Sequence, residues 1–172
     1  MPRPKIDVPK SAPDLWLTLS ATFALVLLAG ITAKGYADTP HTIPFRFGMN
    51  GWPVLYADRV RYWILPFTGS MVFAVVQLLT LRVHRFPYPV RITPRNAAVR
   101  YRAAIRLMYF LLTLFLLGVS YLQHYTLEIG AGGQPLPRFW PAVLYLLILT
   151  AGTLYFTRQL YSPEEDVPAL QL

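Results

Sequence analysis

The sequence predicts an all-α integral membrane protein with four transmembrane helices. Of its 172 residues, 55% are hydrophobic and only 14% are charged, whereas soluble proteins average about 25% charged residues. The charges avoid four long apolar stretches instead of being interspersed with them. Too few charges remain to cover a soluble globule, and the mean hydropathy of +0.40 agrees with burial in lipid.

The four apolar stretches are the predicted transmembrane spans. None contains a charged residue, and at about 1.5 Å per residue each approximates the roughly 30 Å hydrocarbon core of a bilayer. The spans, which together form one membrane domain over residues 15–156, are residues 15–33, 63–81, 107–122 and 139–156. Four buried helices of a soluble protein would instead need amphipathic partners, which this sequence lacks.

The first stretch has a second interpretation, as a secretory signal peptide. Three basic residues precede it, and Ala33 is a conceivable cleavage position. The stretch is longer than the usual apolar region of a signal, which favours a retained span.

Basic residues are distributed unevenly between the segments that flank the spans. Eleven of the sixteen Lys and Arg residues lie in the amino-terminal segment 1–14, the segment 82–106 and the tail 157–172. The other five lie in the loops 34–62 and 123–138. Since the cytoplasmic loops of membrane proteins are enriched in Lys and Arg, we expect both termini to be cytoplasmic and both loops to be external. Residues 162–172 of this acidic tail contain three acidic residues and two prolines, so we expect them to be disordered.

The first external loop is rich in proline, glycine and aromatic residues, which predicts ordered structure. Apolar residues alternate with other residues from Ile43 to Gly48, as in a strand, and Asn50 and Gly51 form a turn pair because both tolerate positive φ. We expect a short β-hairpin that packs Phe45, Phe47 and Trp52 on helix ends or headgroups. The predicted recognition surface comprises Ile43, Pro44, Arg46, Phe47, Gly51, Trp52 and Pro53.

The run Ile43–Pro53 (IPFRFGMNGWP) resembles a known family, domain of unknown function 1648, which is the amino-terminal module of SdpI-type bacterial immunity membrane proteins. That family has Ile or Val, Pro, any residue, His and Phe, then a short polar gap and Gly-x-Pro. The matching positions are Ile43, Pro44, Phe47, Gly51 and Pro53, and Arg46 stands where the family has His. Residues 86–107 resemble the segment that precedes the third span in small members.

This resemblance implies a small, multi-pass protein of a bacterial cytoplasmic membrane. Relatives protect a bacterium from a secreted peptide toxin and participate in signalling. We therefore expect a protein of the immunity or signal-transduction type that binds a peptide, a lipid or a membrane-protein partner. A transporter subunit or transport accessory protein is the alternative, and it should line a water-accessible path with polar residues from several spans. The sequence does not predict an oligomeric state.

Candidate catalytic and metal-ligating residues are few. The chain has no cysteine and no HExxH, nucleophile elbow, Walker loop or paired catalytic carboxylates, so we expect neither enzymatic activity nor a cofactor. A divalent metal ion could be held only by a group at the external mouth of the first and third spans. That group would be Asp38, His41, His124 and Glu128, and we favour the interpretation that they are ordinary interfacial residues.

Two further sets of polar residues have predicted roles. Gln77 is the most polar residue deep in a span, and we expect it to form a hydrogen bond between helices. Arg95, Arg102 and Arg106 share one helical stripe, which predicts contact with anionic lipid headgroups or docking of a partner. Nucleic-acid binding is not expected, because no nucleic-acid-binding motif accompanies the basic residues.

Overall fold

The computed structural model describes residues 9, 11–88, 90, 92–94, 96–133 and 139–161. It is 75% helical and contains four long helices and a small two-stranded sheet. The helices are α1 (Ala12–Asp38), α2 (Ile64–Thr80), α3 (Ala97–Gly130) and α4 (Phe139–Tyr161), with short 3-10 helices η1 (Arg59–Trp63) and η2 (Val83–Arg85). All four long helices, with α2 extended by η1, are long and apolar enough to cross a membrane. The prediction of four apolar helices is thus confirmed, although α1, α3 and α4 extend beyond the predicted spans. The predicted disordered end falls on residues 162–172, which lie outside the described residues.

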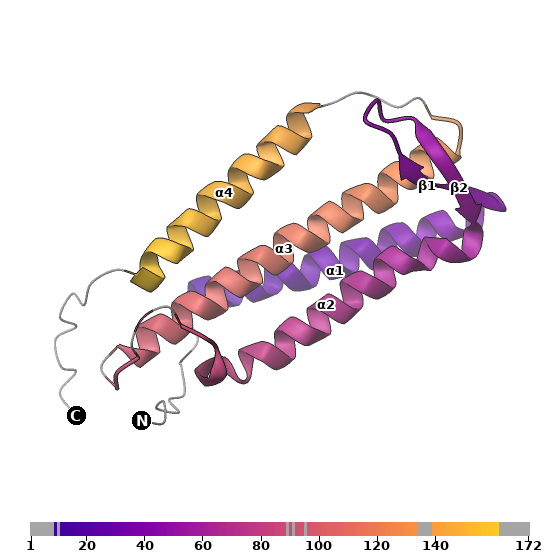
Figure 1. The fold of residues 1–172 in the computed structure, drawn as a ribbon. Coiled ribbons are helices and arrows are strands. Elements are labelled where there is room, and N and C mark those ends of the chain that lie inside the picture. The colour runs from indigo at the N-terminus through magenta and orange to yellow at the C-terminus, as the bar shows by residue number, and fades with distance from the viewer. Residues whose placement is uncertain are drawn as a thin grey trace.

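The central element is α3, which packs against each of the other three helices (Figure 1). Ala21, Ala24 and Leu28 of α1 form the core with Leu112 and Leu116 of α3, and all five are buried. The small alanines allow the two helix backbones to approach closely, as is common between membrane helices.

Gly69 brings α2 into the same contact. A Cβ atom at this position would lie 2.6 Å from Leu28 Cδ2 and 3.2 Å from Leu116 Cδ2. A larger residue would therefore push α2 away from the core that α1 and α3 share.

The last helix, α4, packs on the opposite side of α3 and leans away from the other helices (Figure 1). Tyr145 donates a hydrogen bond to the Leu114 carbonyl over 3.2 Å. At the carboxyl end of α4, the buried Arg100 of α3 donates to the carbonyls of Gln159 (2.9 Å) and Leu160. A guanidinium group satisfies these terminal carbonyls and complements the negative end of the helix dipole. The start of α3 and the end of α4 therefore lie at the same end of the molecule, which we call the basic end.

The strands β1 (Thr42–Phe47) and β2 (Pro53–Asp58) form an antiparallel hairpin at the opposite end, which we call the hairpin end. The predicted hairpin is confirmed, but its turn differs from the expected one. Gly51 has a φ of 78°, whereas no non-glycine residue in the described part has positive φ. Asn50 instead accepts a hydrogen bond from the Trp52 amide through its side-chain oxygen, over 3.1 Å. Only glycine supplies the left-handed conformation here, and Asn50 supports the turn by its side chain.

The pairing of the hairpin is irregular at Phe45. Pro44 pairs with Tyr56, and Arg46 pairs with Leu55, so Phe45 has no partner on the other strand. The strict alternation that the sequence predicted is therefore wrong: Ile43 and Pro44 are both buried, and Phe45 and Arg46 are both exposed. Such a bulge turns the following side chains to a different face.

Candidate functional site

One face of the hairpin is fixed to the end of α3. Ile43 is 3% exposed. Pro44 lies beside Gly130 of α3: a Cβ atom added at Gly130 would be 3.5 Å from Pro44 Cδ. The ring of Phe47 packs on that of Tyr125 with 5.0 Å between centroids. The Tyr125 hydroxyl also donates to the Gly51 carbonyl over 3.0 Å. The turn of the hairpin is thus bonded directly to a helix.

The end of the second strand is fixed to α1 by Arg59. Its guanidinium donates to the Tyr36 carbonyl over 2.6 Å and lies 4.1 Å from the centroid of the Tyr36 ring. The Arg59 amide donates to the His41 carbonyl over 3.0 Å, and Asp58 accepts from the Val60 amide over 2.9 Å. The hairpin is therefore held at both of its ends by helices that are far apart in sequence.

The rest of the hairpin exposes large apolar side chains. Phe45 is 42% exposed and Trp52 is 54% exposed, so neither packs on the helix ends as Phe47 does. The guanidinium of Arg61 lies 5.0 Å from the centroid of the Phe45 ring. The exposed large apolar side chains of the hairpin are those of Phe45, Trp52, Val54, Leu55 and Tyr56. Of the predicted recognition residues, Arg46 is exposed with them, whereas Ile43 and Pro44 are buried.

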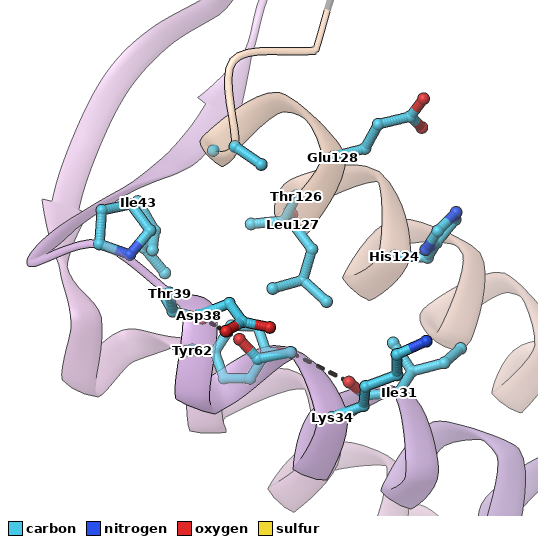
Figure 2. A pocket seen from close by; sticks show the side chains of 14 residues that line it. Ile31, Lys34, Asp38, Thr39, Ile43, Tyr62, His124, Thr126, Leu127 and Glu128 are labelled. Carbon is cyan, nitrogen blue, oxygen red and sulfur yellow. Dashed lines mark hydrogen bonds between the residues drawn. The ribbon is translucent and has the colours of Figure 1, made fainter.

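A cavity of about 520 Å³ lies between the ends of α1 and α3, beside the hairpin (Figure 2). Figure 2 shows Ile43 of β1 on one side and His124 of α3 on the opposite side. Gly35 makes this close approach of α1 and α3 possible, because a Cβ atom there would overlap the side chain of Leu127 and lie 2.8 Å from the Tyr62 hydroxyl. The Tyr62 hydroxyl donates to the Ile31 carbonyl over 3.4 Å.

Four ionisable residues line this cavity: Lys34 and Asp38 on α1, and His124 and Glu128 on α3. Within the described residues, none of their side chains has a hydrogen bond or an ion pair. Three of them, together with His41, make up the alternative metal site that the sequence suggests. His41 does not line the cavity, and the described residues contain no group of three His, Cys, Asp or Glu that could hold a metal ion.

Polar side chains within the bundle form hydrogen bonds between neighbouring elements. Gln77 of α2 accepts a hydrogen bond from the Tyr109 hydroxyl of α3 over 2.8 Å. Gln123, which is 1% exposed, donates to the Tyr62 carbonyl over 3.3 Å. The roles of Tyr109 and Gln123 are not predictable from the sequence, because nothing local in it indicates which residue of another element they meet.

The predicted arginine stripe lies at the basic end. Arg106 Nε lies 2.5 Å from Asp14 Oδ1, and its NH2 group donates to the Ser11 hydroxyl over 2.9 Å. Arg102 Nε is 3.8 Å from the other carboxylate oxygen of Asp14. Arg95 lies outside the described residues. Two of the three arginines therefore have an acidic partner within the chain, which the sequence analysis did not predict.

Comparisons with protein family models, with curated proteins and with solved structures find no match to this chain. Its function must be argued from the fold and from the geometry at the two ends of the bundle.

Proposed function

We propose that this chain is a membrane-embedded binding protein whose hairpin recognises a peptide or membrane-protein partner. The observation that carries the proposal is the asymmetry of the hairpin. Its two ends are fixed by Tyr125 and by Arg59, whereas much of the rest exposes large apolar side chains together with Arg46. Contiguous exposed apolar patches commonly mark interaction sites, and a surface that is already ordered loses little entropy on binding.

The chemistry of this exposed surface indicates what a partner would offer. Arg46 is permanently charged and can donate two parallel hydrogen bonds to one carboxylate. Trp52 and Tyr56, which are 54% and 57% exposed, belong to the residue types that dominate binding energy at interfaces. An acidic group flanked by apolar residues would complement them.

The proposed orientation places the hairpin end outside the cell and both termini in the cytoplasm. It is supported by the concentration of Lys and Arg in the segments of the basic end, because cytoplasmic segments are enriched in these residues. In this orientation the stripe of Arg95, Arg102 and Arg106 would lie at the cytoplasmic leaflet. Donors of Arg102 and Arg106 that Asp14, Ser11 and Pro9 do not use would contact anionic headgroups there.

The resemblance of Ile43–Pro53 to the SdpI-type module supports a bacterial cytoplasmic membrane and an immunity or signal-transduction role. Transport is the second candidate. It would require polar residues that line a path through several spans, whereas Gln77, Tyr109 and Gln123 form hydrogen bonds within the bundle. The cavity described above also lies at the end of the bundle. These contacts favour binding over transport.

Site-specific photo-crosslinking tests the proposed recognition face. A benzophenone amino acid at Trp52 or Tyr56 should give a discrete adduct with an external peptide or membrane protein in whole cells. The same group at Leu154, an exposed apolar residue of α4, serves as the control and should not give that adduct. The Arg46→Ala variant should weaken the adduct at both hairpin positions. An adduct that is insensitive to Arg46 or that also forms at Leu154 would contradict the proposal.

A further inference from the structure

The cavity at the hairpin end has the size and preformed walls of a ligand site. Its volume of about 520 Å³ falls within the roughly 300–1,000 Å³ typical of small-molecule pockets. Its walls are mainly apolar and include Ile31, Ile43 and Leu127. Tyr62, which is 2% exposed, fixes one wall through its hydrogen bond to α1. The exposed hairpin face, with Arg46, is a different surface, so an inference about the cavity does not depend on the proposed function.

The ionisable residues of the cavity are arranged in two layers. Both α1 and α3 run towards the hairpin end. Each contributes a basic residue, Lys or His, followed four residues later by an acidic one. These pairs are Lys34 and Asp38 on α1, and His124 and Glu128 on α3. Residues four apart share a helix face and are separated by about 6 Å along the axis. Lys34 and His124 thus form a layer nearer the middle of the bundle, and the two carboxylates form a layer nearer its end.

Apolar surface continues from this site towards the middle of the bundle. Leu27 lies seven residues before Lys34, and Leu117 lies seven residues before His124. These leucines share the faces of the two cavity residues, and they are 37% and 38% exposed. An acyl chain could therefore lie against both helices directly below the charged layers.

We propose that this cavity binds the headgroup of phosphatidylethanolamine. In this lipid the phosphate is nearer the acyl chains, and the primary ammonium lies beyond it on a two-carbon link. The phosphate would accept hydrogen bonds from Lys34 and His124, and the ammonium would donate to Asp38 and Glu128. The order of these groups along the lipid matches the order of the layers, and both carboxylates and Lys34 gain the charged partners that they lack among the described residues.

Two other headgroup classes fit this site less well. A purely anionic headgroup offers no cation to Asp38 and Glu128, and both carboxylates repel it. The quaternary ammonium of choline cannot donate hydrogen bonds and is usually held by several aromatic rings. Tyr62 is the single aromatic residue among the described residues that line the cavity.

Native mass spectrometry of the full-length protein, released from nanodiscs of equal parts phosphatidylethanolamine, phosphatidylcholine and phosphatidylglycerol, tests the proposal. The wild type should retain the ethanolamine lipid in preference to both others. The double variant Asp38→Asn/Glu128→Gln has nearly the same shape but neutral acceptors, so its preference for ethanolamine over choline should fall about tenfold. Lys34→Met should instead reduce retention of the ethanolamine and choline lipids alike, because both carry the phosphate that Lys34 would bind.

Arg46→Gln is the matched control, because it removes a cation at the same end but outside the cavity. It should leave lipid retention unchanged, even if it abolishes partner crosslinking at the hairpin. Equal retention of all three lipids by the wild type would overturn the proposal and leave a peptide as the candidate occupant. An unchanged preference in the double variant, with thermal stability equal to that of the wild type, would also overturn it.

Discussion

Arg106 Nε donates a hydrogen bond to Asp14 Oδ1 over 2.5 Å, although the two residues are 92 positions apart in sequence. The Asp14 carboxylate also accepts from the backbone amide of Ser11 over 2.8 Å. The side chain of Asp14 is 8% exposed and that of Arg106 is 20% exposed, so water compensates little for either partner if the other is lost. This contact joins the first turn of α1 to α3 at the basic end.

Replacing Arg106 should therefore destabilise the packing of α1 on α3. In Arg106→Gln, Asp14 loses a charged hydrogen bond in a nearly buried position, and we expect the free energy of unfolding to fall by about 2 kcal/mol. Unfolding of the full chain in mixed micelles with a denaturing detergent measures this change. Arg85→Gln is the control, because Arg85 is exposed at the same end. Equal stability of the two variants would contradict an anchoring role for Arg106.

Gly152 sets the distance between α4 and α3. A Cβ atom at this position would overlap the ring of Phe110, which also lies 5.5 Å from the Phe156 ring, centroid to centroid. We expect Gly152→Leu to cost about 1–3 kcal/mol through overpacking. Adding Phe110→Ala should recover part of the loss, whereas two non-interacting substitutions would simply add. The same unfolding measurement on both single variants and the double variant distinguishes these outcomes.

The spans and the hairpin were predictable from the sequence because each depends on local pattern. Uncharged stretches predict the helices, and the alternation near Ile43 followed by Gly51 predicts the hairpin. The bulge at Phe45 was not predictable, because it arises where the consecutive residues Ile43 and Pro44 are both buried. In that case tertiary burial outweighs the two-residue period of a strand.

The composition of the candidate site was predictable only in part. Asp38, His124 and Glu128 could be placed at the same mouth from the topology, and they do line one cavity. Lys34 and the apolar walls change the chemistry of that cavity from metal ligation to recognition of a charged amphiphile. Their convergence depends on the close approach of α1 and α3 at Gly35, which a single sequence cannot reveal. The pairing of Asp14 with Arg106 is invisible in sequence for the same reason.

The proposed orientation predicts the behaviour of reporter fusions. Alkaline phosphatase fused after Tyr161, at the end of α4, should be inactive, whereas the same enzyme inserted at Met49 in the hairpin turn should be active. The reason is that the Lys and Arg residues of the basic end should retain that end in the cytoplasm. Activity after Tyr161 together with inactivity at Met49 would reverse the orientation and place the hairpin in the cytoplasm.

The order of the hairpin depends on Gly51, and its substitution should uncouple the recognition face from the bundle. Gly51 has a φ of 78°, a conformation that costs an L-residue about 1–2 kcal/mol and is worst for β-branched side chains. Its carbonyl also accepts the hydrogen bond from Tyr125. Gly51→Val should therefore detach the turn from α3, and proteinase K added on the hairpin side of sealed vesicles should cut the loop several times faster than in the wild type.

Met49→Val is the matched control, since Met49 is fully exposed in the same turn and its φ is not positive. If both variants are cut at the wild-type rate, the order of the hairpin does not depend on the left-handed residue, and its other contacts to the helices, such as Phe47 with Tyr125 and Arg59 with Tyr36, suffice to hold it.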